Sequence, residues 1–208
     1  ADRFVALLKK KALEMKVGCA YDEETKLGPG VSEKHKKSIC DWIQKGIDEG
    51  AELVLDGRDP VVPGYENGFF VGPTILDHVK PGMTVGDREI FGPVTLIKRV
   101  KDFDEGIALM NANPFANGSV IFTQSGYYAR QFEMLTDGGM VGINVGIPVP
   151  SAYFPFSGNK DSFFGDQHVL GLDGVRFYTR AKTVTKHWYD EHSRTKTVDT
   201  WEGTVERN

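Results

Sequence analysis

Strand-like and helix-like segments alternate through the middle of the chain, and this alternation constrains the fold more than any other feature. The strand-like runs are rich in Val, Ile, Phe and Thr, and the segments between them carry apolar residues at helical spacing. We expect strands at 94–100, 119–123 and 141–145, with helices at 103–111 and 127–135 between them. This pattern predicts an α/β fold with an open, mostly parallel sheet that is flanked by helices.

Residues that begin and end helices support these two helices. Asp102 and Glu105 have the spacing of a capping box at the start of the first helix. Asn113-Pro114 ends that helix, because the residue before a proline avoids helical geometry, and Gly138-Gly139 ends the second. These residues therefore predict where the first helix begins and where both helices end.

The first half of the chain predicts two more helices and two more strands. Apolar residues at helical spacing predict a helix over residues 1–16. Ser32 is expected to cap a second helix that ends at Gly50. Strands are expected at Glu52 to Leu55 and at Gly68 to Val71.

The last third of the chain contains three segments that differ in composition and periodicity. From Gly146 to Asp173 it is aromatic, rich in Gly and Pro and without periodicity, which predicts an ordered loop that lines a cavity. Residues Gly174 to Lys186 alternate apolar and polar side chains, which predicts a strand. The polar residues 189–208 predict a loosely docked tail. We expect one domain over 1–173, a strand segment over 174–188 and the tail over 189–208.

Charge and hydropathy argue against nucleic acid and membrane as partners. The formal charge is −4, and Lys and Arg are dispersed among acids, so the chain lacks the basic stripe of a nucleic-acid binder. No apolar run approaches the roughly 20 residues of a membrane helix. We expect a soluble protein of the bacterial cytoplasm, or of the mitochondrial matrix if the source is eukaryotic.

Cysteine and histidine are placed without a metal or nucleophile pattern. Cys40 lies among apolar residues of a predicted helix, where a small buried thiol is expected. Cys19 precedes an acidic run that is expected to raise its pKa. Both are expected to be reduced. The five histidines show no ligand spacing, so metal binding is not expected.

The segment Asp87-Arg88-Glu89-Ile90-Phe91-Gly92-Pro93-Val94 carries the clearest chemical signal. An acid, an aromatic ring and a Gly-Pro turn lie within five positions. A carboxylate can accept hydrogen bonds from both hydroxyls of a ribose, and a nearby ring can cover one face of a flat heterocycle. The alternative is a structural turn before a buried strand at 94–97.

Further motifs stand in order around this segment, and together they resemble the carboxyl-terminal part of the aldehyde dehydrogenase family, which uses NAD or NADP. They are Leu27-Gly28-Pro29-Gly30-Val31, Gly68-Phe69-Phe70-Val71-Gly72-Pro73, Asn113-Pro114-Phe115, Gly142-Ile143-Asn144 and Pro155-Phe156-Ser157-Gly158. The resemblance runs from Ala1 to about Trp188. Gly146-Ile147-Pro148-Val149-Pro150 and Asp161-Ser162-Phe163-Phe164-Gly165-Asp166 narrow it to the branch that acylates coenzyme A.

The resemblance implies roles for five residues. Glu89 would bind the ribose beside the nicotinamide of NAD, and Phe91 would lie beside the nicotinamide ring. Phe156 and Ile147 would line the substrate pocket. Asn144 would support the catalytic loop. The family pattern has a second acid before Glu89, and this chain has Arg88 there, which could pair with Glu89.

The same resemblance places the catalytic residues outside this chain. In the family, the nucleophilic cysteine and the glycine-rich nucleotide-binding half precede the region that matches Ala1. The residues agree, since no G-x-G-x-x-G follows a strand here. We expect an inactive portion of an enzyme that oxidises a small semialdehyde through a cysteine thioester, with NAD as oxidant and coenzyme A as acyl acceptor. Self-association through Gly174 to Lys186 is expected. The alternatives are a non-acylating dehydrogenase and a non-catalytic assembly module.

Overall fold

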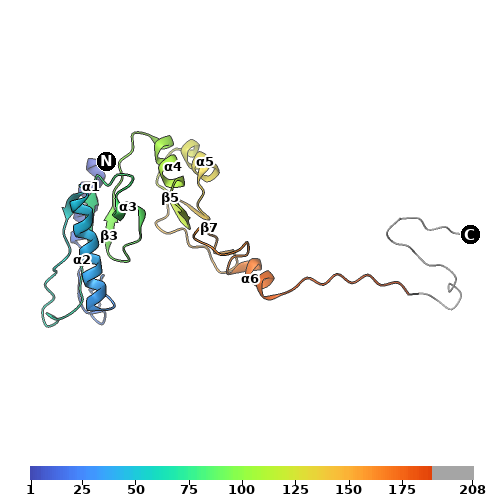
Figure 1. Ribbon diagram of the computed structural model, residues 1–208, viewed down its shortest axis with the longest axis horizontal. Coiled ribbons are helices and arrows are strands. Elements are labelled where there is room, and N and C mark those ends of the chain that lie inside the picture. The colour runs from blue at the N-terminus through green and yellow to red at the C-terminus, as the bar shows by residue number, and fades with distance from the viewer. Residues whose placement is uncertain (189–208) are drawn as a thin grey trace, which may run out of the picture.

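The computed structural model describes residues 1–188, which form two lobes and an extended segment (Figure 1). The first lobe contains α1 to β3, and the second contains α4 to α6. The elements are α1 (Asp2–Leu13), α2 (Glu33–Asp48), β1 (Glu52–Leu55), β2 (Thr74–Asp77), α3 (Thr84–Asp87), β3 (Val94–Leu96), α4 (Phe103–Asn111), β4 (Phe115–Ala116), β5 (Gly118–Ile121), α5 (Gly126–Leu135), β6 (Met140–Ile143), β7 (Asn159–Lys160) and α6 (Gly171–Tyr178).

The first lobe is a three-stranded sheet covered by α2. Strand β2 lies in the centre, antiparallel to β1 and parallel to β3. All four residues of β2 are buried. Ile39 and Ile43 of α2 pack with Val71 to form part of the core. Gly46 permits the close approach of α2, because a Cβ there would lie 2.8 Å from Cδ1 of Leu76.

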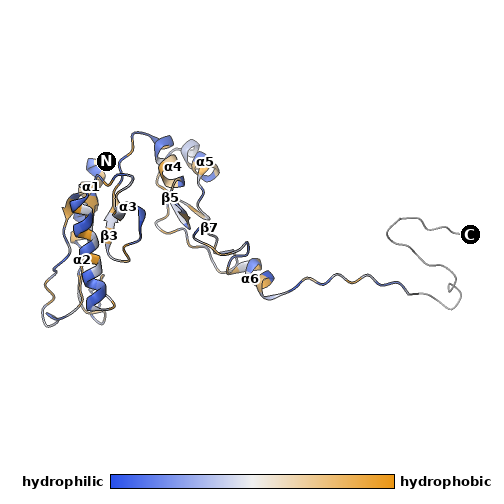
Figure 2. Ribbon diagram, in the orientation of Figure 1, coloured by the Kyte–Doolittle hydropathy of each residue, from blue (hydrophilic) through white to orange (hydrophobic). Residues whose placement is uncertain are grey.

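Helix α2 begins where its capping residue predicts. The Ser32 side chain accepts a hydrogen bond from the His35 backbone N–H at 3.2 Å, and Ser32 itself has extended geometry. Orange and blue segments alternate along α2 in Figure 2, as an amphipathic helix requires. The side chains of this helix therefore face the sheet in a fixed register.

The second lobe is built on the parallel pair β5 and β6, which α5 connects. Asp102 caps α4 by accepting from the Glu105 N–H at 2.9 Å, and Ser125 caps α5. The short strands β4 and β7 pair antiparallel, so the loop after β6 returns to the lobe at Lys160. The helices and strands predicted from 94 to 145 all form, with strands shorter by a few residues.

Two predicted strands are wrong. Residues 68–71 are not a strand: Phe70 and Val71 fill the core without a ladder, and Pro73 delays the strand to Thr74. Residues 174–178 belong to α6, in which Leu172, Val175 and Tyr178 stand at the three-residue spacing of a helix. Residues 179–188 then run without regular structure. The predicted tail at 189–208 lies outside the described residues.

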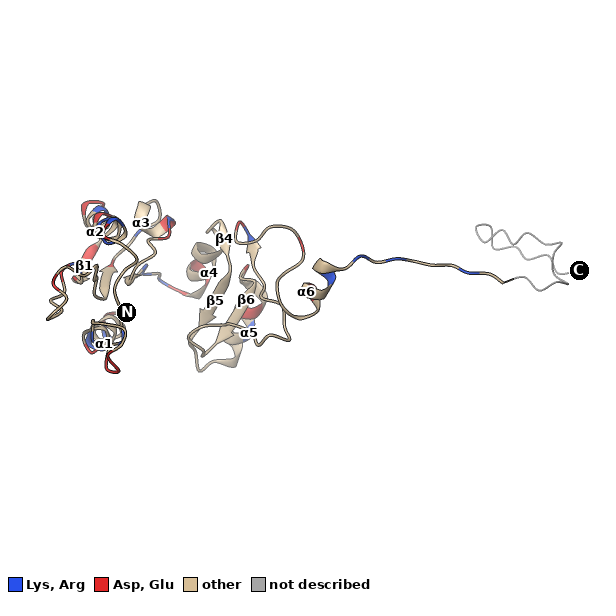
Figure 3. Cartoon of the chain, turned by 90° about the horizontal axis from the view of Figure 1, so that it is seen from below, with Lys and Arg blue, Asp and Glu red and all other residues tan. Residues whose placement is uncertain are grey.

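The predicted sheet is present only in pieces. The strands form three separate sheets in the described chain, with parallel pairing in two of them. Basic and acidic residues are intermixed on α1 and α2, whereas residues 179–188 carry basic residues without acids (Figure 3). Within residues 1–188, no helix is long and apolar enough to cross a membrane. No cluster of three His, Cys, Asp or Glu side chains suited to a metal ion occurs there.

Candidate functional site

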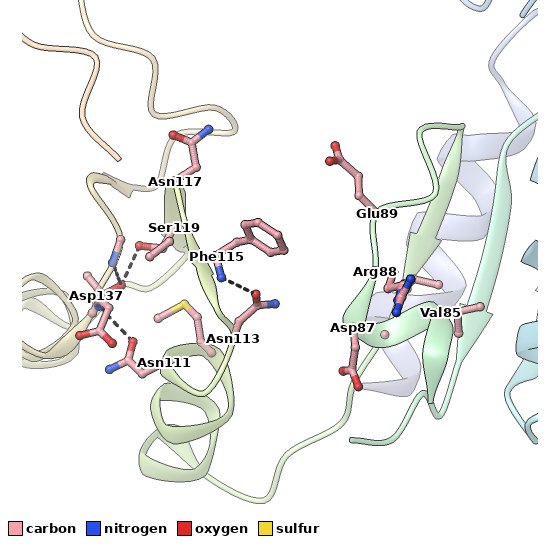
Figure 4. Close-up of a pocket in the computed structure, with 17 residues that line it drawn as sticks. Val85, Asp87, Arg88, Glu89, Asn111, Asn113, Phe115, Asn117, Ser119 and Asp137 are labelled. Carbon is pink, nitrogen blue, oxygen red and sulfur yellow. Dashed lines mark hydrogen bonds between the residues drawn. The ribbon is translucent and has the colours of Figure 1, made fainter. Parts of the chain in front are cut away.

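A cavity of about 680 Å³ lies between the two lobes and includes the segment with the strongest sequence signal. Residues 85–89 and Leu96 line it from the first lobe, and the residues around β4 and β5 line it from the second. Figure 4 shows Glu89 extending into the space between the lobes, with Phe115 and Asn117 across from it. The two lobes thus contribute opposite walls of one cleft.

Glu89 presents a carboxylate that is available to a ligand. Its side chain is exposed, and among residues 1–188 it makes no hydrogen bond or ion pair. In particular, no ion pair joins it to Arg88, so the pairing considered from the sequence does not form. An unpaired carboxylate at a cleft can accept two hydrogen bonds from neighbouring hydroxyls.

Helix α3 determines where this carboxylate lies, and Glu49 caps that helix. The Glu49 carboxylate accepts from the Thr84 N–H at 2.7 Å and from the Thr84 hydroxyl at 2.5 Å. The hydrogen bond from the Thr84 side chain is the main reason that the pKa of Glu49 is lowered. Glu89 follows two residues after the end of α3 at Asp87. The bonds to Glu49 at the start of this short helix therefore help to place Glu89.

Phe91 lies beside the cleft rather than in its lining. The residue is 73% exposed, and its backbone has the left-handed φ of +59° that non-glycine residues rarely adopt. The Phe91 carbonyl accepts a hydrogen bond from Nε2 of His35 on α2 at 2.9 Å. The next residue, Gly92, lies against Ile39, since a Cβ there would be 2.8 Å from Cδ1 of that side chain.

Hydrogen bonds and an ion pair hold the opposite wall together. Nζ of Lys160 lies 2.6 Å from Oδ2 of Asp137 and donates to the Asn111 carbonyl at 2.5 Å. The Asn111 side chain accepts from the Asp137 N–H at 3.0 Å, a bond drawn in Figure 4. Asn159 donates to the Asp137 carbonyl at 2.8 Å. These contacts join α4, β7 and the turn after α5 into a fixed surface.

The remaining predicted residues lie away from this cleft. Asn144 has a φ of +56°, and its side-chain amide accepts from the N–H of Thr123 at 2.8 Å and donates to its carbonyl at 2.9 Å. It therefore braces the segment after β5. Phe156 is half-buried and pairs through its backbone with Val169. Ile147 is 77% exposed. The structure does not bring Glu89, Phe156 and Ile147 into one cavity.

The two cysteines are free thiols, and neither lines the cleft. Burial raises the pKa of Cys40. The expectation for Cys19 was wrong: hydrogen bonds with the Tyr65 side chain and with the Tyr21 backbone lower its pKa and outweigh burial and Asp22. The acidic run gives no net rise in the pKa of Cys19, because Lys16 forms ion pairs with Asp22 and Glu24.

The family model for the aldehyde dehydrogenase family matches residues 1–184. The chain belongs to this family. It is 49% identical to malonate-semialdehyde dehydrogenase 1 of Bacillus licheniformis over 91% of this chain and 38% of that protein. It is 45% identical to malonate-semialdehyde dehydrogenase 2 of Shouchella clausii over 91% of this chain and 39% of that protein.

Solved structures of other aldehyde dehydrogenases agree with this assignment. A methylmalonate-semialdehyde dehydrogenase from Oceanimonas doudoroffii superposes with a TM-score of 0.89 at 44% identity, over 93% of this chain and 40% of that one. A protein from Sinorhizobium meliloti, described as a putative methylmalonate-semialdehyde dehydrogenase in complex with NAD, gives 0.88 at 40% identity, over 91% and 38%. The resemblance drawn from the motifs is confirmed. The chain spans about two fifths of the length of these relatives.

Three residues of this aldehyde dehydrogenase chain were missed by sequence reasoning. His35 contacts Phe91, and Glu49 contacts Thr84. Both pairs are far apart in the sequence, so no local pattern predicts them. Asp137 directly precedes the glycine pair 138–139 and was not singled out from the sequence. A concentration of Asn at 111, 113 and 117 was the one available signal for the second wall.

Proposed function

We propose that the chain is a portion of an NAD-dependent, coenzyme A-acylating dehydrogenase of malonate or methylmalonate semialdehyde. The observation that supports it most is the unpaired Glu89 carboxylate at the cleft, in a chain 49% identical to a malonate-semialdehyde dehydrogenase. The bacterial sources of its relatives support a cytoplasmic location. We also propose that the nucleophilic cysteine lies in residues of the parent enzyme outside this chain.

The residues of this chain fit one end of a nicotinamide nucleotide. Glu89 would accept hydrogen bonds from the two ribose hydroxyls, and the exposed Phe91 ring would cover the nicotinamide. NAD, when bound, accepts the hydride that the substrate carbon loses. The contribution of this chain is positional, because it holds the ribose while a thiolate from elsewhere carries the acyl group.

The cleft itself supports the proposal that other residues of the parent complete the fold. Strand β3 borders it through Leu96, and β5 borders it through Gly118 and Ser119. Both strands belong to parallel pairs. We propose that residues outside this chain lie between these edges and join the pairs into one open sheet. Self-association of the parent would use Gly174 to Lys186, which here form the end of α6 and the extended segment after it.

Replacing Glu89 with Gln in the full-length enzyme tests the function. The amide removes the charge and half the acceptor capacity, so the KM for NAD should rise about tenfold, as expected for loss of charged hydrogen bonds. Glu133→Gln on α5 is the matched control, since Glu133 is exposed and makes no ion pair among the described residues. An unchanged KM for NAD in Glu89→Gln would contradict the assignment.

The acyl acceptor requires its own experiment. A non-acylating dehydrogenase releases a free acid because water cleaves the thioester, whereas the proposed enzyme releases a coenzyme A thioester. Analysis of the products of the full-length enzyme, with and without coenzyme A, separates the two. Free acid as the only product in both assays would favour the non-acylating alternative.

A further inference from the structure

The backbone beside Glu89 adopts a conformation that needs an external restraint. Phe91 has a φ of +59°, a region that disfavours side chains with a Cβ. Phe91 as a whole is 73% exposed, so packing against neighbours does not hold it there. Among residues 1–188, the backbone N–H and C=O groups of residues 89–91 make one hydrogen bond, which is the bond from His35 to the Phe91 carbonyl.

His35 is well placed to supply that restraint. It lies in the first turn of α2, where its own N–H is bonded to the Ser32 side chain. Its Nε2 lies 2.9 Å from the Phe91 carbonyl oxygen. Since a carbonyl only accepts hydrogen bonds, Nε2 must carry the proton. The other ring nitrogen, Nδ1, is buried without a partner. The ring is therefore oriented so that Nε2 reaches the Phe91 carbonyl, while Nδ1 is left without a hydrogen bond.

The same face of α2 restrains the following residue. Ile39 lies one turn after His35, and a Cβ on Gly92 would meet three of its atoms at 2.8–2.9 Å. His35 thus holds the Phe91 carbonyl while Ile39 limits how closely Gly92 can approach. Two contacts from one rigid helix fix two successive peptide units.

From this geometry we infer that His35 is a positioning residue for NAD binding, which acts through the Phe91 carbonyl and not by touching the reacting atoms. The inference rests on the proposed function, because it assigns to His35 the placement of Glu89 and Phe91 against the nicotinamide ribose. Without the hydrogen bond, residues 89–91 sample other backbone conformations, and binding must select the competent one. Loss of the His35 hydrogen bond should therefore weaken NAD binding and leave binding of the semialdehyde nearly unchanged.

The test compares two substitutions of His35 in the full-length enzyme. His35→Leu removes the donor. His35→Gln keeps an N–H donor at a similar distance from the helix. The dissociation constant for NAD, measured by calorimetry, should rise about three- to tenfold in His35→Leu, the loss expected for one neutral hydrogen bond. In His35→Gln it should stay within about twofold. The KM for the semialdehyde should be unchanged in both.

Controls separate this role from general stability and from the proposed function. Lys34→Leu changes an exposed neighbour on the same turn that has no ion pair among the described residues, and it should bind NAD normally. Equal NAD affinity in His35→Leu and the wild type would overturn the inference, as would a folded His35→Gln that binds as weakly as His35→Leu. If Glu89→Gln weakens NAD binding and His35→Leu does not, only the positioning role fails. If neither does, the proposed function fails.

Discussion

Gly92 lies too close to helix α2 to carry a side chain. Gly92→Ala would place a Cβ within 2.9 Å of three atoms of Ile39, which is 2% exposed and has little room to move. We expect the free energy of unfolding to fall by about 1–3 kcal/mol, the usual result of overpacking a core. Urea denaturation measures this change.

A second glycine controls for the loss of backbone freedom. A Cβ at Gly126 meets no atom within 4 Å, so Gly126→Ala should leave stability equal or slightly higher. If the two variants unfold at the same urea concentration, the contact between Gly92 and Ile39 does not limit the position of the cleft segment.

Asn144 combines a left-handed backbone with two side-chain hydrogen bonds to Thr123. Asn144→Ala removes both bonds and leaves a residue less suited to a φ of +56°. We expect a loss of about 2 kcal/mol in the free energy of unfolding, measured by thermal denaturation. Asn144→Gly should recover part of it, because glycine tolerates the backbone geometry. Failure of glycine to recover any stability would assign the whole loss to the hydrogen bonds.

The positions of residues next to a strong local pattern were predictable from the sequence, and contacts at a distance were not. Glu89 lies at the cleft and Asn144 directly follows β6, as expected, whereas their roles stay predictions. His35 is 56 positions from the carbonyl it binds. Such a contact depends on how α2 crosses the sheet, which is decided by Ile39, Ile43 and Gly46 together.

Arg99, in the segment after β3, joins two elements of the first lobe, β2 and α1. Asp77 at the end of β2 is 1% exposed, and it accepts from Nε of Arg99 at 3.1 Å and from Nη2 at 2.7 Å. Arg99 also binds Asp2 of α1. Arg99→Met would leave a buried carboxylate unpaired. We expect a loss of about 2–3 kcal/mol by urea denaturation, at the lower end for such pairs because the Arg99 side chain is 29% exposed.

A second substitution tests whether the unpaired charge of Asp77 causes the loss of stability in Arg99→Met. Adding Asp77→Asn to Arg99→Met removes the unpaired charge, so the double variant should be more stable than Arg99→Met alone. A double variant that is less stable by the sum of the two single losses would show that the residues do not interact.

The same pair predicts a pH dependence. The hydrogen bond with Arg99 lowers the pKa of Asp77 below its ordinary value. A group whose pKa is lowered by folding stabilises the protein above its unfolded pKa, which is about 4 for Asp, and this contribution is lost as the pH falls through the folded pKa. The stability difference between wild type and Arg99→Met should therefore be constant from pH 7 to about 5 and shrink below pH 4. A constant difference down to pH 2 would contradict this.

At the scale of elements, helices were predicted better than strands because their ends carry their own signals. Ser32 and Asp102 cap α2 and α4 as expected, and each cap is a contact between near neighbours. Strand identity depends on pairing with a distant segment. Residues 68–71, of which Phe70 and Val71 are buried, were therefore predicted as a strand although they form no ladder. In α6, Gly174 was taken as a strand start, whereas it lies inside a helix.

For the whole molecule, the family was predictable and the architecture of this chain was not. Motif order alone predicted the aldehyde dehydrogenase family. The single open sheet was not found, because the parallel pairs β2–β3 and β5–β6 lie in different lobes. The edges that face the cleft have no partner among the described strands, so the alternation of strands and helices along the sequence did not translate into one sheet.

The isolated chain should not reduce NAD with malonate semialdehyde and coenzyme A. Thioester chemistry needs a thiolate beside the hydride acceptor. Cys40 has a pKa raised by burial, and Cys19 lines a separate cavity with Lys16 and Tyr65. Neither lines the cleft with Glu89. In a spectrophotometric assay of NADH formation, the chain should match the buffer blank. In the full-length enzyme, Cys19→Ser and Cys40→Ser should retain activity. NADH formation by the isolated chain, or loss of activity in either variant, would mean that a described cysteine is the nucleophile and that the catalytic group lies inside this chain.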